Sequence, residues 1–302
     1  MSAPGAGEFL LDLPREETIR ILAASPLVRR WVWHAQIDST QCLARELAVS
    51  EGPGLLVLAD TQTAGRGRMG RSWFSPRHAG LWLSMVVGLQ RPAQEWPLVT
   101  SLAALALREA VEVGAGLLCA LKWPNDLIHR GRKLAGILAD VGPGDAVVLG
   151  VGLNVGQRVT DFPPELRDRA GSILTETGQL RPRGCFLEAF LEALARWLER
   201  FEEGAGEEIR AALREASLLM GRTVCVRQLG GVSGRQESSV RGRVCDIGVL
   251  GELILEPLDA SRAVSEWENS AGETEGAGTG AGRVTVSSGV LLEIDPPIEG
   301  GK

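Results

Sequence analysis

Apolar residues recur along this chain in two rhythms, every three or four positions in some stretches and every second position in others. The first rhythm predicts helices over residues 16–24, 40–48, 97–113, 183–201 and 207–220. Alternating or short continuous apolar runs predict strands over residues 31–36, 55–59, 81–87, 117–123, 127–129, 134–141 and 146–153. Because single helices separate these strands, we expect an α+β fold, in which a mixed β-sheet carries its helices on one face.

The pattern changes at residue 223. Short alternating runs at residues 223–228, 240–247, 251–256 and 283–294 are separated by glycine-rich turns, which is typical of a small β-barrel. Residues 265–282 consist mainly of glutamate, serine, glycine and alanine, so we interpret them as a disordered insertion. The chain therefore divides into a short N-terminal extension (1–30), a main domain (31–221) and a C-terminal domain (222–302).

Composition narrows the class of protein. The 302 residues are 44% hydrophobic, enough for a sizeable core and for two domains, and the net charge of −6 argues against broad nucleic-acid binding. No apolar run reaches the length of about 18 residues that indicates a membrane span, and the first residues lack a secretory signal, so we expect a soluble cytoplasmic protein. The five scattered cysteines indicate reduced thiols, not metal ligands.

A loop rich in glycine and arginine is the first candidate for chemistry. It reads Gly65-Arg-Gly-Arg-Met-Gly-Arg71, in which glycines allow close backbone approach to a ligand and arginines match phosphate or carboxylate groups. The glycine spacing also fits a dinucleotide-binding turn, but strand-like sequence follows where that turn needs a helix. A flexible basic surface loop is the alternative interpretation. We favour a loop that closes over an anion.

Lysine usage indicates a second candidate. Of the 32 basic residues only Lys122, Lys133 and Lys302 are lysines, and the first two lie close together in the sequence. A compact ammonium group reaches where a guanidinium is too wide, and Lys122 begins a turn, Trp123-Pro-Asn-Asp126, that carries polar groups. Coincidence in a lysine-poor chain is the alternative, and for Lys133 a basic residue in a hairpin turn is nearly as good an interpretation.

Four segments in order resemble the successive motifs of the biotin protein ligase family: Gly65-Arg-Gly-Arg-Met-Gly-Arg-Ser-Trp-Phe-Ser-Pro76, Lys122-Trp-Pro-Asn-Asp-Leu127, Lys133-Leu-Ala-Gly-Ile-Leu138 and Gly150-Val-Gly-Leu-Asn154. The resemblance is strong over residues 33–154 and weaker over the C-terminal domain. It implies a catalytic domain similar to class II synthetases and a C-terminal SH3-like β-barrel. It also implies a two-step activity, in which biotin and ATP form biotinyl-5'-AMP and a lysine of a biotin carboxyl carrier protein then takes the biotinyl group.

Site residues follow from the matching positions. A biotin pocket needs mostly apolar walls with a few fixed polar groups. The resemblance assigns biotin binding to Ser39, Thr40, Gln41, Gln62, Gly65, Arg66, Gly67, Arg68, Lys122 and Gly136. Helix capping is the plain structural alternative for Ser39 and Thr40, and both roles are compatible.

Joining the biotin carboxylate to the α-phosphate of ATP brings two anions together, and we assign catalysis of this step to Lys122, Arg66 and Arg68. The nucleotide is assigned to Arg68, Arg71, Trp73, Lys133 and Asn154, with Trp73 as a stacking face for adenine, although an ordinary buried aromatic is an alternative for it. Mg²⁺ is expected with ATP, held through the phosphates, and no metal ligand of the protein is named.

Partners and alternatives complete the sequence interpretation. About 30 residues precede Trp31, too few for the winged helix-turn-helix module of family members that act as repressors, so we expect no nucleic-acid partner and no membrane partner. A homodimer is one of the oligomeric states that stay open. Three other functions remain: a lipoate or octanoate transferase of the same overall fold, a nicotinamide-dependent oxidoreductase, and a non-catalytic biotin-binding module.

Overall fold

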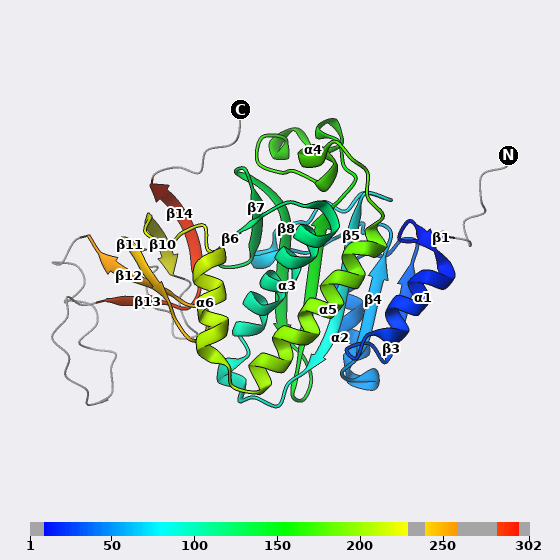
Figure 1. Ribbon diagram of the computed structural model, residues 1–302, viewed down its shortest axis with the longest axis horizontal. Helices are drawn as coiled ribbons and strands as arrows, with labels where there is room; N and C mark the ends of the chain where they lie inside the picture. Colours follow the sequence, from blue (N-terminus) through cyan, green and yellow to red (C-terminus); the bar gives the residue numbers. More distant parts are fainter. Residues whose placement is uncertain (1–8, 229–238, 259–282, 296–302) are drawn as a thin grey trace.

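The computed structural model describes residues 9–228, 239–258 and 283–295, and these residues form two separate main sheets (Figure 1). The insertion predicted at residues 265–282 lies outside the described residues. The larger sheet has seven strands and the smaller one five. A third, two-stranded sheet pairs β1 (Phe9–Leu10) with β2 (Leu13–Pro14).

The seven-stranded sheet is mixed, as predicted. Its order is β3-β4-β5-β9-β8-β7-β6; the β3–β4 pair is parallel and all other neighbours are antiparallel. The strands are β3 (Arg30–His34), β4 (Leu55–Ala59), β5 (Gly80–Gly88), β6 (Ala120–Lys122), β7 (Asp126–His129), β8 (Arg132–Val141) and β9 (Ala146–Asn154). The strand expected at residues 117–123 is therefore shorter than predicted.

The helices cover both faces of this sheet, so the prediction of helices on one face is wrong for one helix. α3 (Leu98–Ala115) and α5 (Arg183–Glu202) pack side by side on one face (Figure 1). α2 (Thr40–Glu51) packs on the other. Strand β4 shows the division: Leu56 and Leu58 join the core under α3 and α5, whereas Leu55 and Val57 pack against α2. Helical spacing fixes which side of a helix is buried but not which face of a sheet it covers.

The remaining helices surround this core. They are α1 (Arg15–Ala24), α4 (Ile173–Thr177) and α6 (Gly206–Ala216), together with the 3₁₀ turns η1 (Arg68–Gly70), η2 (Ala93–Glu95), η3 (Val159–Asp161) and η4 (Pro164–Leu166). Residues 9–24 pack on the main domain, because Leu10, Leu11 and Leu22 are buried in its core.

The smaller sheet is antiparallel, in the order β13-β12-β11-β10-β14. Its strands are β10 (Thr223–Gln228), β11 (Ser239–Ile247), β12 (Leu253–Pro257), β13 (Val284–Val286) and β14 (Gly289–Asp295). The described pairings leave this sheet open, so the predicted closure into a barrel is not confirmed.

Contacts from the β6–β7 turn and from α6 tie the smaller sheet to the main domain. The indole N–H of Trp123, in the turn between β6 and β7, donates to the carbonyl of Gly251 at 3.1 Å. On α6, the guanidinium groups of Arg210 and Arg214 both pair with the carboxylate of Asp246 on β11. The hydrogen bond from Arg214 first, then those from the backbone of Ile247 and from Arg210, outweigh partial burial and hold the pKa of Asp246 below its usual range.

The ion pairs of Asp246 with Arg210 and Arg214 predict that the contact between α6 and the smaller sheet is sensitive to acid. Because the pKa of Asp246 is lowered in the folded protein, its stabilisation is complete above the unfolded value of about 3.9 and is lost as the pH falls below it. The melting temperature should therefore fall more steeply below about pH 4 in the parent protein than in Asp246→Asn, which lacks this charge. Thermal unfolding of both proteins across these pH values measures the difference, and Asp145→Asn, a change at an exposed aspartate, is the control. If the melting temperatures of the parent protein and of Asp246→Asn fell in parallel with pH, this prediction would be contradicted.

None of the helices in the described part of the chain combines the length and the apolar run that crossing a bilayer would require.

Candidate functional site

A cavity of about 1120 Å³ opens on the sheet face opposite α3 and α5. Its walls come from the start of α2, the glycine–arginine loop, the turn that follows Lys122, strands β8 and β9, and residues 289–291 of β14. Both sheets thus contribute to one cavity. All of the residues that the sequence assigns to biotin and ATP line it: Ser39, Thr40, Gln41, Gln62, Gly65, Arg66, Gly67, Arg68, Arg71, Trp73, Lys122, Lys133, Gly136 and Asn154.

The floor of the cavity is made of strand residues with small side chains. In β9, Val151 and Leu153 point to the core under α3 and α5, so Gly150 and Gly152 face the cavity. Gly136 of β8 is the cross-strand partner of Gly152, and Ser84 of β5 is the partner of Gly150. The absence of large side chains at these positions leaves room for a ligand directly on the sheet.

A neutral polar pocket lies where α2 begins. The backbone N–H and hydroxyl of Thr40 donate to the amide oxygen of Gln62 at 2.8 and 3.1 Å, and the Gln62 amide nitrogen donates to the Ser75 hydroxyl at 2.9 Å. The Gln41 amide is also engaged: it donates to the carbonyl of Val148 and accepts from Ser84. These bonds fix the orientation of the pocket before any ligand arrives.

Ser39 differs from its neighbours. It occupies the N-cap position of α2, but its side chain makes no capping bond, contrary to the capping alternative. The hydroxyl is buried and has no hydrogen-bond partner in the part of the chain that the structure describes. Since an unpaired buried hydroxyl is costly, the arrangement indicates a ligand group at this point of the cavity.

The glycine–arginine loop is closed by its own backbone. Trp73 N–H donates to the Gly65 carbonyl at 2.8 Å and Gly67 N–H donates to the Arg71 carbonyl at 2.8 Å. A Cβ at Gly65 would lie 2.5 Å from the Trp73 carbonyl oxygen, so only glycine fits there. The loop then leads into β5 without a helix, as expected from the sequence and contrary to a dinucleotide-binding turn.

Cations without ion pairs surround the cavity. Among the described residues, no carboxylate lies within ion-pairing distance of Lys122, Arg66, Arg68 or Arg71. Lys122 and Arg68 are half-buried, whereas Arg66 and Arg71 are exposed. Burial first of all lowers the pKa of Arg68; the charge of Asp126 opposes this shift and that of Arg71 adds to it. A half-buried guanidinium without a paired carboxylate favours an anionic ligand.

Trp73 lies over the glycine pair of the cavity floor. An added Cβ at Gly136 would approach its ring to 3.0 Å, and one at Gly152 would overlap with its indole nitrogen. The ammonium of Lys133 lies 5.1 Å from the centre of the Trp73 ring and pairs with Asp126 at 2.5 Å. Trp73 also meets Trp82 edge to face, with ring centres 6.4 Å apart. Trp73 therefore lies beside the cations, and its role as a stacking face for adenine stays a prediction.

Comparison with known proteins agrees with this arrangement. A domain of the biotin/lipoate A/B protein ligase family matches residues 33–154. The Bifunctional ligase/repressor BirA of Bacillus subtilis is 34% identical over 77% of this chain and 71% of its own length. The Biotin–[acetyl-CoA-carboxylase] ligase of Mycobacterium tuberculosis is 37% identical over 71% of this chain and 82% of its own. The chain belongs to the biotin protein ligase family.

A solved structure extends the comparison to three dimensions. The biotin protein ligase of Aquifex aeolicus in complex with biotin and ATP superposes with a TM-score of 0.68 at 26% identity, covering 88% of this chain and 98% of that one. The nicotinamide-dependent alternative and the lipoate alternative are not favoured by these relatives.

Asn154 is less free than the sequence suggested. Asn154 lines the cavity but is only 4% exposed. Its side-chain amide donates to the Gly171 carbonyl and accepts from the side chain of Gln157. Its amide nitrogen is directed at the protein, so any contact with a nucleotide would use the remaining acceptor capacity of its oxygen.

Some cavity residues were missed by sequence reasoning. Ser84 was seen only as a member of a strand, and Gly150 and Gly152 belong to the fourth motif but were given no site role. Residues 289–291 come from the C-terminal sheet. The alternation of glycine with apolar residues in β9 was a usable signal for Gly150 and Gly152, because it marks one face of the strand as empty. In the described ranges, no three His, Cys, Asp or Glu side chains gather as a metal site.

Proposed function

We propose that this protein activates biotin as biotinyl-5'-AMP with ATP and transfers the biotinyl group to a lysine of a biotin carboxyl carrier protein. The observation that carries the proposal is the pairing of a neutral polar pocket at Ser39 and Thr40 with unpaired cations at Lys122, Arg66 and Arg68 around one cavity. Such a site suits a ligand that is neutral at one end and joins two anions at the other.

In the first step, a carboxylate oxygen of biotin attacks the α-phosphorus of ATP, the bond to the bridging oxygen breaks, and pyrophosphate leaves. Lys122 and Arg68 would neutralise the two anions as they approach, because they are half-buried and therefore weakly screened. Arg66 and Arg71, which are exposed, would approach the phosphates from the loop. Positioning and electrostatics supply the catalysis, and no nucleophile of the protein is needed.

In the second step, the neutral amine of the acceptor lysine attacks the carbonyl carbon of the mixed anhydride. The bond to the AMP oxygen breaks, an amide forms, and the amine loses a proton. The lysine reaches the anhydride only through the open side of the cavity, so the protein must hold the adenylate until an acceptor arrives. Mg²⁺ would stay on the phosphates of ATP, since no set of protein ligands for it is assigned.

The proposal includes the organisation of the chain. We assign residues 1–30 to a short N-terminal extension, residues 31–221 to the catalytic domain and residues 222–302 to an SH3-like domain. The C-terminal sheet would complete the site through residues 289–291, which line the cavity. A cytoplasmic location fits the five free cysteines, of which Cys119 is buried.

Transfer to a carrier tests the function. The protein is incubated with ATP, Mg²⁺ and a purified biotin carboxyl carrier domain, together with biotin, lipoate or octanoate in separate reactions. We expect biotin alone to be attached to the carrier, and no product with a carrier whose acceptor lysine is changed to arginine. Attachment of lipoate or octanoate in place of biotin would establish the alternative transferase, and pyrophosphate release without transfer would contradict the second step.

Arg66 and Arg68, two of the three arginines of the loop, should contribute unequally to binding of the adenylate. Arg68→Gln should weaken binding of a non-hydrolysable biotinyl-AMP analogue about 10- to 100-fold, the loss expected for a hydrogen bond to a charged group of about 1.5–3 kcal/mol. Arg66→Gln should weaken it only a few-fold, because its charge is exposed and screened. Titration calorimetry measures both values. A larger loss for Arg66→Gln would contradict the assignment based on burial.

A further inference from the structure

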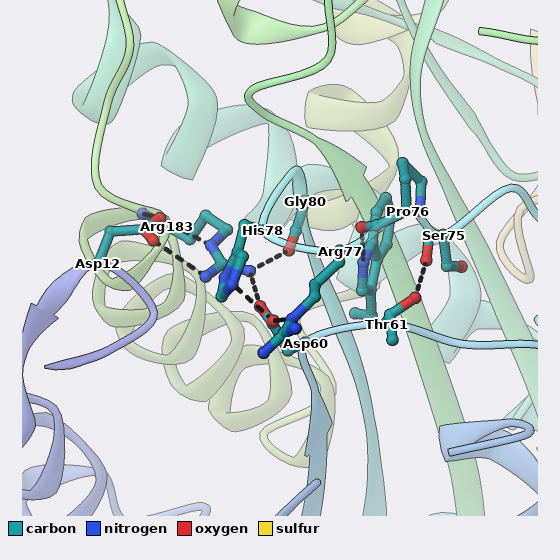
Figure 2. Close-up of polar contacts among 10 residues, drawn as sticks. Asp12, Asp60, Thr61, Ser75, Pro76, Arg77, His78, Gly80 and Arg183 are labelled. Carbon is teal, nitrogen blue, oxygen red and sulfur yellow. Dashed lines mark hydrogen bonds and ion pairs between the residues drawn. The ribbon is translucent and has the colours of Figure 1, made fainter. Parts of the chain in front are cut away.

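Asp60 is a buried carboxylate that does not line the cavity. It directly follows β4, stands two residues before Gln62, and is 2% exposed. An isolated buried charge is strongly unfavourable, so its pairing partners indicate why the carboxylate is there. Figure 2 shows that they come from two directions.

On one side, Asp60 contacts the body of the catalytic domain. Arg183, the first residue of α5, is 3% exposed and donates from Nη1 to Asp60 Oδ1 at 2.8 Å. The same guanidinium pairs with both carboxylate oxygens of Asp12, at 2.7 and 2.9 Å, and contacts the Gly80 carbonyl at 3.3 Å. Arg183 therefore joins the N-terminal segment, the end of β4 and the start of β5 (Figure 2). The positive charge of Arg183 is already balanced by the carboxylate of Asp12 alone.

On the other side, Asp60 contacts the segment that returns from the glycine–arginine loop to β5. Its Oδ2 atom lies 3.2 Å from Arg77 Nε and 3.0 Å from His78 Nδ1 (Figure 2). Both of these side chains are 63% exposed. His78 has a φ of +56°, a conformation that is uncommon outside glycine and persists only where the surroundings hold it.

The return segment connects these contacts to the biotin pocket. The Thr61 hydroxyl donates to the Ser75 carbonyl at 2.8 Å, and the Ser75 hydroxyl accepts from Gln62, which in turn accepts from the Thr40 N–H. Asp60 thus holds both ends of the loop: its own backbone leads into Thr61 and Gln62, and its carboxylate fixes the two residues that follow Pro76.

We propose that Asp60 is a positioning residue for biotin binding. It anchors the return segment of the loop at Arg77 and His78 and thereby fixes Gln62 in the neutral polar pocket. This inference rests on the proposed function. The plain structural alternative is that the cluster of Asp12, Asp60 and Arg183 only stabilises the fold. The positioning role and the purely structural role predict different results when Asp12 and Asp60 are neutralised one at a time.

The test compares Asp60→Asn with its matched control Asp12→Asn in the full chain. Each variant removes one carboxylate from Arg183 and leaves the other, so the buried charge stays balanced in both. Only Asp60→Asn removes the carboxylate charge that Arg77 and His78 contact. We expect the dissociation constant for biotin without ATP to rise about tenfold in Asp60→Asn and to stay within about twofold in Asp12→Asn. Both variants should lower the melting temperature.

Hydrogen exchange gives a second readout of the anchoring. The backbone N–H of Gln62, which donates to the Ser75 carbonyl, should exchange its hydrogen faster in Asp60→Asn than in Asp12→Asn. If Asp60→Asn does not fold, the double variant Arg77→Gln/His78→Gln removes the same contacts from the exposed side and should reproduce both effects.

Three outcomes separate the possibilities. Unchanged biotin binding in folded Asp60→Asn, or in the double variant, would overturn the inference. Equal weakening in Asp60→Asn and Asp12→Asn would establish the purely structural role and also overturn it. Failure of the unmodified protein to bind biotin would instead contradict the proposed function, so the two failures are distinguishable.

Discussion

Lys122→Gln should reduce the rate of biotinyl-AMP formation about 100- to 1000-fold, the usual effect of removing one group that stabilises charge in a transition state. Glutamine keeps a polar side chain of similar reach but has no charge to set against the biotin carboxylate and the α-phosphate. Lys122 is half-buried at the end of β6, lines the cavity and has no ion pair among the described residues, so its charge is available to a ligand. Pyrophosphate release with biotin and ATP gives the rate.

A control comes from the next turn of the sheet, between β7 and β8. Arg130→Gln removes a neighbouring positive charge that is exposed and outside the cavity, and it should leave the rate within about twofold. The melting temperature of Lys122→Gln should equal that of the parent protein, because no described contact is lost. Near-normal pyrophosphate release by folded Lys122→Gln would remove this lysine from the mechanism.

Gly152→Ala should raise the KM for ATP about 10- to 100-fold, because the added methyl group cannot coexist with the indole of Trp73 over the cavity floor. The strand is buried on both sides and paired on both edges, so the ring must move and the backbone stays. Moving Trp73 also displaces Lys133 from its ring. Steady-state kinetics with ATP as the varied substrate measures the change.

Gly206→Ala is the control for this variant, since an added Cβ there meets nothing within 4 Å. It should leave both kinetic constants unchanged. A second arm, Trp73→Phe, keeps a ring on the glycine pair and should raise KM less than Gly152→Ala does. If folded Gly152→Ala has the KM of the parent protein, the Trp73 platform does not contact the nucleotide.

The elements of the fold could be predicted largely because they depend on local patterns. Strand β4 runs over the residues expected from its continuous apolar sequence, and α5 follows the apolar spacing of residues 183–201. The placement of α2 could not be predicted, because its amphipathic pattern fits either face of the sheet. The N-terminal segment was expected as an extension, but Leu10 and Leu11 are buried, and only the tertiary structure shows what covers them.

The site shows the same limit. Short motifs identified Lys122 and the loop arginines, because glycine and charge stand out within a few residues. Ser84 was missed, since a single small residue in a strand is informative only when its neighbours across the sheet are known. The pair of Asp60 and Arg183 lies 123 residues apart in the sequence and carries no local pattern.

The most direct measurement of the central claim needs only the purified protein, biotin, ATP and Mg²⁺, without any acceptor. We expect the protein to retain biotinyl-5'-AMP, detected by mass spectrometry, and to release pyrophosphate in equal amount. We also expect Lys122→Gln to form neither product at a comparable rate. A folded protein that binds biotin but gives neither biotinyl-5'-AMP nor pyrophosphate would contradict the account.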